Sequence, residues 1–380
     1  MIIGVDGSCL QGARTGAGWY LTHLLEALSH HLEEDKIIVW MNSPTPEERA
    51  RVPENRFISV SATHYPWSAL KMTWSMMGTP TMENLLGRPA DLCFYPNYLP
   101  LPQKNGKGVL FIHDLAYLTN PEWVEGSTLK NYKKNIEKQE EQADLILTCS
   151  EFNRRELLKH FIHLSESKVR VIPHGLSKEF QKPVPAEKVG PVKDRYRITR
   201  PYFLFVGTLE PRKNLLRLVH AFLLFKQKEN TQHELILAGP KGWIGEDFLH
   251  FIQSPTLVQK VRWIEYVAPE DLPALYSGAE AFVFPSLKEG FGLPLLEAMG
   301  CGTPVIASNN AAIPEVVGDA ALLVEPVSVN EWCQAFQRVV ADPQLREDMR
   351  RKGRARVSLF RWENSAAQTL VAFKMLLGSR

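Results

Sequence analysis

Short apolar runs alternate with longer amphipathic stretches along the whole chain. Strands buried on both faces are apolar throughout, whereas the helices that cover them are apolar on one side, so this alternation is typical of parallel sheets wrapped by helices. We predict strands at residues 2–5, 37–40, 57–60, 92–95, 109–112, 145–148 and 169–172, and a second series at residues 202–206, 234–238, 261–265, 281–284, 304–307 and 321–324. The predicted fold class is therefore α/β.

The composition changes between the two series of strands. Residues 181–200 are rich in Lys, Pro and charged side chains, which do not continue a core element, and we place an interdomain linker there. A chain of 380 residues is long enough for two cores. We therefore predict an N-terminal domain at residues 1–180, a C-terminal domain at residues 201–360, and a final helix at residues 361–380 whose apolar face covers one of the domains.

The charge balance and the cysteines narrow the class of protein. With 44 basic and 42 acidic residues the formal net charge is +2, so no strong field favours nucleic acid. The five cysteines are scattered without CxxC spacing, which indicates neither a disulfide framework nor a zinc site and fits a reducing cytoplasm. The N-terminus is patterned as a buried strand rather than as a secretion signal, and no segment reaches the roughly 18 apolar residues of a membrane span.

Two glutamates bracket a glycine turn late in the second series of strands. Gly290 and Gly292 allow a sharp turn and a close approach of a ligand to the backbone. A helix is predicted at residues 293–299, and the free N–H groups at its start favour a phosphate or diphosphate. Glu289 precedes the turn and Glu297 lies about one turn into the helix, so the two carboxylates suit hydroxyls at opposite ends of one ligand. The alternative is an ordinary strand, loop and helix with acidic residues near the helix start.

Two adjacent cations follow the first strand of the second series. Arg212 and Lys213 stand at a helix start, where positive charge is unfavourable for the helix dipole, so we expect them to serve an anion. Arg212 offers a planar fork to phosphate oxygens, and Lys213 adds a compact charge. A solvated basic turn is the alternative. Two later strand ends, at residues 237–242 and 263–272, suit loops whose backbone groups clasp a nucleobase.

A glycine-containing turn also follows the first strand of the chain. Gly16 and Gly18 lie where free backbone N–H groups can contact a phosphate, before a helix predicted at residues 19–28. A dinucleotide fingerprint is disfavoured on two counts. Leu21 stands where the third glycine is needed, and the second strand leads into Asn42 rather than into the acidic residue that would bind a ribose.

Two histidines stand at the ends of predicted strands in the N-terminal domain. His113, beside Asp114, follows a buried strand, and the carboxyl ends of such strands face the ligand crevice in open α/β sheets. It is placed to donate a hydrogen bond to a sugar hydroxyl or a phosphate, and the alternative is a histidine that caps a loop. For His174, nearer the linker, a role in a hinge or in packing is favoured.

Residues 64–77 are aromatic, rich in methionine and nearly uncharged. Such a segment could line an acceptor site or touch a surface of lipid headgroups. A helix packed on the first sheet explains the same composition, and we favour that interpretation.

Taken in order, these motifs resemble the family 4 retaining glycosyltransferases of GT-B fold. The resemblance rests on Gly16 and Gly18 after the first strand, the His113-Asp114 pair, the Glu-Pro-Arg212-Lys213-Asn loop, and Glu289 with Glu297. Within the family, the chain looks most like bacterial mannosyltransferases that build O-antigen and other surface polysaccharides. The resemblance implies two Rossmann-like domains facing across a cleft, the first on the acceptor side and the second binding the nucleotide sugar, with the last helix crossing back to the first.

The resemblance also implies roles for individual residues. Arg212 and Lys213 would neutralise the donor diphosphate, Glu289 would bind the hydroxyls of the transferred sugar, and Glu297 would bind the ribose. His113 would contact the donor sugar or the leaving phosphate from the first domain. The donor would further be bound by loop and turn residues, which are Gly16, Gly18, Thr208, Tyr266, Val267, Gly290, Phe291, Gly292 and Leu293. One departure is His174, because many members have an asparagine at this position.

The implied reaction is transfer of a hexose with retention, mannose from GDP-mannose being favoured, onto a saccharide or a lipid-linked saccharide. No metal and no other cofactor is expected, since the chain contains no Asp-x-Asp motif and the two cations can take the place of a metal ion. Such an enzyme would work in the cytoplasm, with peripheral association at the inner face of the membrane. The alternatives are a UDP-sugar or ADP-sugar donor, a phosphorylase or epimerase on a similar scaffold, and a non-catalytic sensor of nucleotide sugars.

Overall fold

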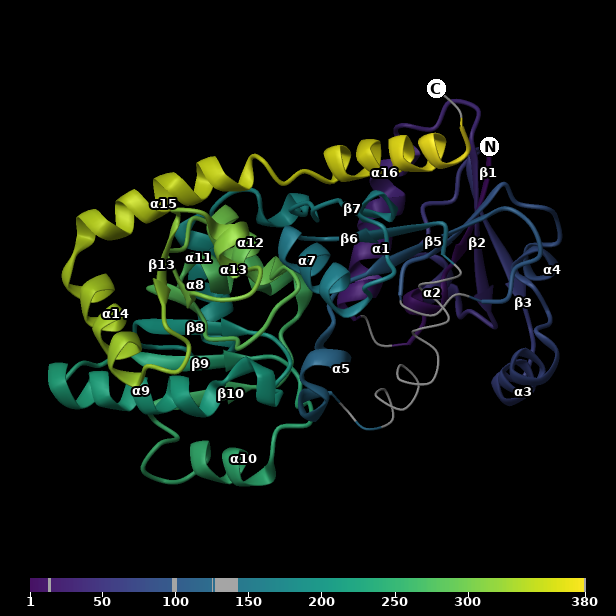
Figure 1. Ribbon diagram of the computed structural model, residues 1–380. Coiled ribbons are helices and arrows are strands. Elements are labelled where there is room, and N and C mark those ends of the chain that lie inside the picture. Colours follow the sequence, from purple (N-terminus) through teal and green to yellow (C-terminus); the bar gives the residue numbers. More distant parts are fainter. Residues whose placement is uncertain (13–14, 98–100, 125, 127–142, 379–380) are drawn as a thin grey trace. The chain divides into compact units, whose positions relative to one another are not determined.

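The computed structural model describes residues 1–12, 15–97, 101–124, 126 and 143–378 (Figure 1). The chain divides into two compact units. Unit 1 comprises Met1–Gly175 and Trp362–Arg380, and unit 2 comprises Leu176–Arg361. Each unit is an α/β domain built on one parallel sheet, so the predicted fold class is confirmed.

Unit 1 contains a sheet of seven parallel strands in the order β3-β2-β1-β4-β5-β6-β7. Its strands are β1 (Ile2–Asp6), β2 (Lys36–Asn42), β3 (Ile58–Thr63), β4 (Leu92–Tyr95), β5 (Lys107–Ile112), β6 (Leu145–Thr148) and β7 (Val169–Val171). From β1 the chain builds the sheet in one direction to β3 and then returns to place β4 on the other side of β1. In open α/β sheets, ligands bind outside the carboxyl ends of the strands at such a switch point.

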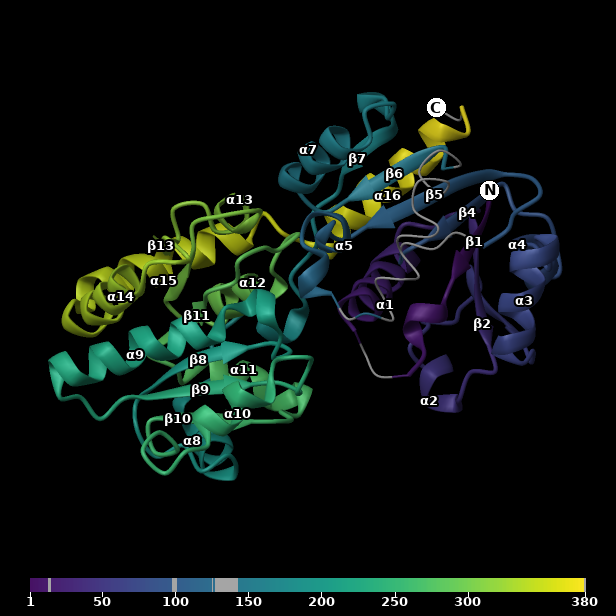
Figure 2. The same ribbon diagram turned by 60° about the horizontal axis from the view of Figure 1, so that its bottom comes forward.

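Helices cover both faces of this sheet. The described helices of unit 1 are η1 (Ser8–Leu10), α1 (Gly16–Ser29), α2 (Pro46–Arg49), α3 (Trp67–Met77), α4 (Met82–Leu86), α5 (Ala116–Thr119), η2 (Pro121–Trp123), α7 (Glu151–His160), η3 (Glu166–Lys168) and α16 (Trp362–Leu376). Figures 1 and 2 both show α16, in yellow, beside α1, in purple. The apolar face predicted for the final helix is buried there through Trp362, Leu370 and Phe373, so this helix belongs to unit 1.

Unit 2 contains a sheet of six parallel strands in the order β10-β9-β8-β11-β12-β13. Its strands are β8 (Tyr202–Val206), β9 (Glu234–Ala238), β10 (Val261–Ile264), β11 (Ala281–Phe284), β12 (Val305–Ser308) and β13 (Ala321–Val324). The same topology recurs, because β8 starts the sheet in one direction and β11 then pairs with its other edge. The switch point of unit 2 therefore lies between β8 and β11.

The helices of unit 2 pack on both faces of its sheet and on one another. They are η4 (Lys178–Phe180), α8 (Ala186–Arg195), η5 (Pro211–Lys213), α9 (Leu215–Glu229), α10 (Glu246–Ile252), η6 (Pro269–Asp271), α11 (Leu272–Ser277), α12 (Leu293–Gly300), α13 (Ile313–Val317), α14 (Val329–Ala341) and α15 (Pro343–Val357). Among them, α9 packs along α14, and α12 packs against α15 (Figure 1).

The segment predicted as a linker, residues 181–200, is instead folded into unit 2. Its middle forms α8, which packs against α11, and the division between the units falls after Gly175. Val189 on α8 packs closely on Gly278, the residue that follows α11. A Cβ added at Gly278 would lie 2.6 Å from Val189 Cγ1. The linker was predicted because the segment as a whole is polar. A short helix needs only one apolar face to pack on a neighbour, so a polar composition does not exclude it.

Candidate functional site

The topology of unit 2 brings two distant loops together. Because β8 and β11 are hydrogen-bonded neighbours, the loop that follows β8 and the loop that follows β11 leave the sheet side by side. Backbone groups help to join them: the N–H of Leu287 donates to the carbonyl of Arg212 over 2.7 Å, and Asn214 Nδ2 donates to the carbonyl of Pro285 over 3.2 Å. The two motifs predicted to bind a donor therefore form one site.

Four charged side chains meet in this site, and we call Glu210, Arg212, Lys213 and Glu289 the charge cluster. Lys213 Nζ lies 2.6 Å from Glu289 Oε1, and Arg212 Nη1 lies 2.7 Å from Glu289 Oε2. The other end of the guanidinium, Arg212 Nη2, lies 2.6 Å from Glu210 Oε1. Lys213 and both glutamates are each less than 10 % exposed. Two cations and two carboxylates cancel formally, as burial of charge requires.

The electrostatics of the cluster keep Glu289 ionised. Burial alone would raise the pKa of its carboxyl, but Arg212 and Lys213 outweigh burial and lower the pKa to about 2. Burial lowers the pKa of Lys213, Arg212 lowers it further, and the carboxylates of Glu289 and Glu210 oppose both. An anion that enters the cluster would therefore meet two cations whose present counter-ions are carboxylates.

The helix that follows Glu289 begins as predicted. α12 starts at Leu293 with Pro294 in its first turn and ends at Gly300, one residue beyond the predicted end. Gly292 precedes it with φ of 102°, a conformation that favours glycine, and a Cβ there would lie 2.8 Å from Leu295 Cδ1. Phe291 is buried, edge-on to Phe360 at a centroid distance of 5.7 Å. The first N–H groups and the positive end of α12 thus directly follow the turn after Glu289.

Glu297 differs from Glu289 in its surroundings. The hydroxyl of Tyr276 on α11 donates to Glu297 Oε2 over 2.8 Å, and burial raises the pKa of the Glu297 carboxyl to about 7. The two glutamates of the motif are therefore held in different states, since Glu289 is a paired carboxylate and Glu297 is poised to gain or lose a proton near neutral pH.

The remaining donor residues of unit 2 lie on loops at the same edge of the sheet. Thr208 follows β8, and Tyr266 and Val267 follow β10. Tyr266 is 75 % exposed, whereas Val267 is buried. The loop after β10 is tied down at its far end, because the Tyr196 hydroxyl accepts from the Ala268 N–H and donates to the carboxylate of Asp271.

In unit 1 the two glycines of the predicted phosphate turn have different surroundings. Gly16 is the first residue of α1, and a Cβ there would meet nothing within 4 Å. A Cβ at Gly18 would lie 2.6 Å from the carbonyl oxygen of Cys9. The hydroxyl of Thr15 caps the helix and accepts from the Gly18 N–H over 3.4 Å. Gly18 is therefore required by packing against η1, and Gly16 is the glycine that keeps space open.

His113 lies at the carboxyl end of β5, as predicted. Its Nε2 donates to the carbonyl of Pro96, which follows β4, over 2.9 Å, and its own carbonyl accepts from Asn153 Nδ2 over 2.7 Å. Burial lowers the pKa of the imidazole to about 4, so His113 is neutral at physiological pH. His174 is buried and stacks on Trp362 with a centroid distance of 5.9 Å, in agreement with the packing role.

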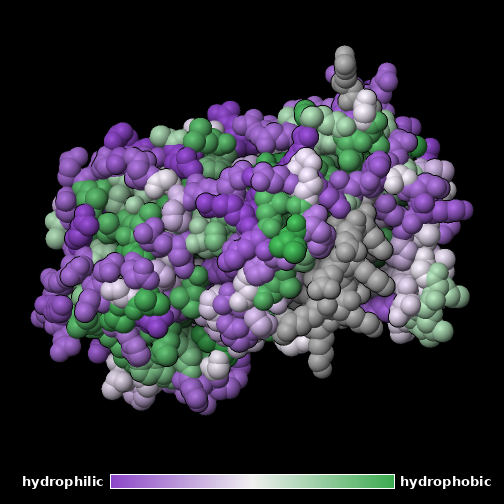
Figure 3. Space-filling model, viewed as in Figure 1, coloured by the Kyte–Doolittle hydropathy of each residue, from purple (hydrophilic) through white to green (hydrophobic). Residues whose placement is uncertain are grey.

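The segment at residues 64–77 packs on the first sheet, as favoured. On α3, Leu70 is buried, and Trp67 and Trp74 lie edge-on to the buried Trp40 at centroid distances of 6.2 and 6.3 Å. The opposite side of the helix is exposed. It carries Met72 and Met76, and the space-filling view shows this pale green region at its lower right (Figure 3).

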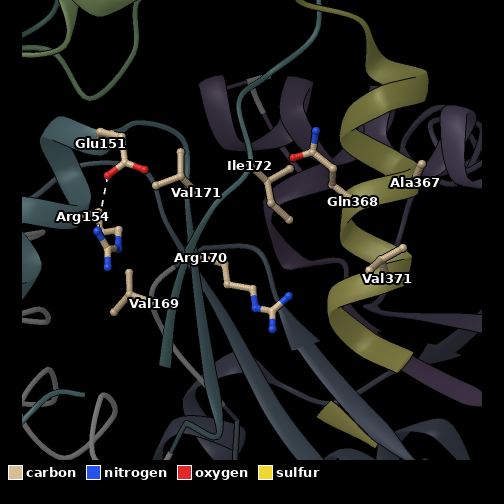
Figure 4. A pocket seen from close by; sticks show the side chains of 9 residues that line it. All are labelled: Glu151, Arg154, Val169, Arg170, Val171, Ile172, Ala367, Gln368 and Val371. Carbon is tan, nitrogen blue, oxygen red and sulfur yellow. Dashed lines mark ion pairs between the residues drawn. The ribbon is translucent and has the colours of Figure 1, made fainter. Parts of the chain in front are cut away.

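A separate pocket of about 540 Å³ lies in unit 1, among β7, α7 and α16 (Figure 4). Glu151, Arg170 and Gln368 are among the residues that line it, and no predicted site residue does. Within the described ranges, no group of three His, Cys, Asp or Glu side chains is arranged to hold a metal ion. Nor does any helix in the described part of the chain have the length and apolarity to cross a bilayer.

Sequence reasoning missed two residues of the site. Glu210 belongs to the same loop as Arg212. A carboxyl group two positions before a cation was the feature of the sequence that could have indicated their ion pair. Tyr276 carried no signal, because it reaches Glu297 only through the packing of α11 on α12.

Known proteins resemble the chain in sequence and in fold. Residues 193–356 match the family described as glycosyl transferases group 1. O-antigen chain mannosyltransferase B of Escherichia coli is 36% identical over 284 residues, which cover 74% of this chain and 73% of that protein. The serotype-specific mannosyltransferase WbdA of Escherichia coli is 29% identical over 291 residues, covering 75% of this chain and 35% of that longer protein. Sucrose-phosphate synthase from Thermosynechococcus elongatus has the same fold, with a TM-score of 0.74 and 22% identity over 99% of both chains.

Proposed function

Because the chain belongs to the group 1 glycosyltransferases and has the GT-B fold that its motifs predicted, we propose that it transfers mannose from GDP-mannose, with retention, onto a hydroxyl of a saccharide or lipid-linked saccharide. The observation that carries this proposal is the charge cluster at the switch point of unit 2. The named functions of the mannosyltransferase relatives support mannose, and surface polysaccharide as the product. No metal and no other cofactor is required in this proposal.

The cluster suits a diphosphate that gains charge as the reaction proceeds. Arg212 and Lys213 would exchange part of their contact with Glu289 for phosphate oxygens, while the N–H groups at the start of α12 bind the same anion. The bond between sugar C1 and the diphosphate oxygen breaks, the acceptor oxygen bonds to C1 from the same face, and the acceptor proton passes to the departing phosphate. Fixed cations stabilise the departing anion more than the bound donor, which lowers the barrier.

The two glutamates would then bind the two ends of the donor. Released in part by the cations, the ionised Glu289 accepts hydrogen bonds from hydroxyls of the transferred sugar. Glu297, which is hydrogen-bonded to Tyr276, accepts from the ribose hydroxyls. His113 is neutral, and because its Nε2–H donates to the Pro96 carbonyl, its Nδ1 would accept a hydrogen bond from a sugar hydroxyl rather than supply a charge.

Calorimetric titration with GDP, UDP and ADP, followed by transfer assays with the corresponding sugar nucleotides, tests this function. Tightest binding of GDP and transfer of mannose to a saccharide acceptor are expected. A preference for UDP or ADP would change the donor within the same class. Phosphate-dependent turnover without an acceptor hydroxyl would indicate a phosphorylase, and nucleotide binding without transfer or hydrolysis would indicate a sensor.

We also propose that the enzyme works in the cytoplasm, at the inner face of the membrane, where a lipid-linked acceptor lies. The observation is α3, whose exposed side and flanks carry large apolar side chains, namely Tyr65, Trp67, Met72, Met76 and Met77. Lys71 is the one Asp, Glu, Lys or Arg between residues 57 and 82, so nothing in this stretch repels anionic lipid.

Flotation with vesicles of phosphatidylethanolamine and phosphatidylglycerol tests the membrane proposal. A variant with Met72→Ser and Met76→Ser should float less than the unchanged protein. Met375→Ser is the matched control, since Met375 is an exposed methionine of the same unit, on α16. Equal flotation of all three proteins would contradict α3 as the contact and leave the transferase function untouched.

A further inference from the structure

Glu210 is a buried carboxylate to which neither the motif nor the family resemblance assigned a role. It is 3 % exposed and immediately precedes η5. Its carbonyl accepts from the Lys213 N–H over 3.0 Å, and its side chain pairs with Arg212 over 2.6 Å. Burial of a carboxylate is unfavourable unless the carboxylate is ion-paired, and the Arg212 guanidinium provides that pair for Glu210.

The two ends of the Arg212 guanidinium contact partners on different sides of the site. Nη1 contacts Glu289 Oε2 over 2.7 Å and donates to the carbonyl of Lys288 over 3.1 Å. Nη2 contacts Glu210 on the other side. A guanidinium held by both ends of its planar fork keeps its orientation when one of the two contacts is withdrawn.

The proposed reaction withdraws one of these contacts. Glu289 lies on the loop that leads into α12 and would turn to the sugar hydroxyls when a donor binds. Glu210 sits almost completely buried beneath the same cations and acts on Lys213 as well, since its charge raises the pKa of that ammonium against the effect of burial. It is therefore the carboxylate suited to remain with Arg212 throughout the reaction.

We infer that Glu210 is a positioning residue of the transferase: it fixes the Arg212 guanidinium toward the donor diphosphate, and its negative charge weakens the hold of the site on the nucleoside diphosphate product. The inference rests on the proposed function, because it requires a diphosphate at Arg212 and Lys213. It assigns the two carboxylates different tasks, Glu289 exchanging partners and Glu210 keeping its partner.

Glu210→Gln is the direct test, since glutamine keeps the shape and one acceptor oxygen and removes only the charge. With one negative charge fewer beside the two cations, the Kd of GDP should fall by about tenfold and depend more steeply on salt concentration. With the ion pair to Arg212 reduced to a neutral hydrogen bond, kcat should fall by about tenfold. Glu210→Asp keeps the charge, so its Kd for GDP should stay close to that of the unchanged enzyme while kcat falls.

Glu234→Gln provides a matched control. Glu234 is also a buried glutamate of unit 2, at the opposite, amino end of β9, and it pairs with Arg200 over 3.6 Å and Arg262 over 3.5 Å. Its substitution should lower Tm and leave kcat and the Kd of GDP unchanged.

The possible outcomes are distinct. Tighter GDP binding together with a lower kcat in Glu210→Gln supports the positioning role. Unchanged kcat and Kd, or a loss of GDP binding that follows a loss of Tm, overturns the inference and leaves the transferase function in place. Failure of the unchanged protein to bind GDP, UDP and ADP would overturn the proposed function and this inference with it.

Discussion

Lys213 Nζ lies 2.6 Å from Glu289 Oε1, although 76 residues separate the two along the chain. The pairing of β8 with β11 is what brings them together, and the contact between the Leu287 N–H and the Arg212 carbonyl holds the two loops in register. A cation from one motif and a carboxylate from the other therefore act as a single unit, so a change at either one alters the site of both.

Removal of either partner should abolish most of the activity. We expect Lys213→Ala and Glu289→Ala each to lower the rate of transfer by at least about 100-fold, the scale seen when one contact to a transition state is lost. Each change also removes one charge from a buried cluster whose charges cancel, so Tm should fall. Initial rates at saturating donor, measured on protein shown to be folded by circular dichroism, provide the test.

Lys352→Ala is the control for this prediction, because Lys352 is a lysine of the same unit whose ion pairs with Asp319 and Asp348 lie on and beside α15. Its rate should stay near that of the unchanged enzyme. Near-normal rates in folded Lys213→Ala and Glu289→Ala would remove the charge cluster from the mechanism.

Acid should weaken the fold through Glu289. The pKa of this carboxyl is lowered from 4.5 to about 2 because Arg212 and Lys213 overcome the effect of burial. Its ionised form therefore contributes stability that is present above pH 4.5 and is lost as the pH falls through about 2. The difference in unfolding free energy between the unchanged protein and Glu289→Gln should be constant above about pH 5 and shrink toward pH 3, as measured by urea denaturation. A difference independent of pH would contradict the pairing.

Glu297 should have the opposite dependence on pH. Burial raises the pKa of its carboxyl from 4.5 to about 7, so the stability contributed by its protonated form is present below pH 4.5 and is lost as the pH rises through 7. Glu297→Gln mimics the protonated form. Its Tm should match that of the unchanged protein at pH 4 and exceed it at pH 8. Thermal melts of both proteins at these two pH values test the prediction.

Nucleotide binding should expel the proton of Glu297. Ribose hydroxyls that donate to this carboxyl favour its ionised form, so GDP binding near pH 6.5 should release a proton. Calorimetry in two buffers with different ionisation enthalpies measures that release. Glu297→Gln should show none, and an identical release in both proteins would place the titrating group elsewhere.

Gly16 and Gly18 should respond differently to the same substitution. A Cβ at Gly18 would lie 2.6 Å from the Cys9 carbonyl oxygen, so Gly18→Ala should destabilise unit 1 by about 1–3 kcal/mol. Gly16 has open space around its Cα, so Gly16→Ala should leave the unfolding free energy nearly unchanged. Chemical denaturation of both variants tests the pair. Equal destabilisation would show that the turn, rather than the contact with Cys9, requires glycine.

Much of the fold could be predicted because it is encoded locally. Each predicted strand, from residues 2–5 to residues 321–324, coincides with an observed strand to within three residues at either end. A strand buried on both faces must be apolar along its whole length, and this requirement is visible in a few consecutive residues. The start of α12 was predictable for the same reason, since glycine and proline restrict the backbone where they stand.

The same local reasoning did not extend to side chains that meet across the sheet. It predicted a linker where α8 packs against α11, and it treated Gly16 and Gly18 as equivalent, although only Gly18 is packed against Cys9. Burial and contact depend on neighbours that are distant in sequence, and composition does not specify those neighbours.

The sequence by itself determined two parallel sheets, the glycine turn before α12, and the residue types suited to a diphosphate and to hydroxyls. Only the tertiary structure decided which charges meet. The order of the strands places the loop after β8 against the loop after β11, so Glu210 and Glu289 share Arg212, while α11 places Tyr276 on Glu297. The physical reason is that backbone preferences act over a few residues, whereas the protonation state and partner of a buried charge are set by every group packed around it.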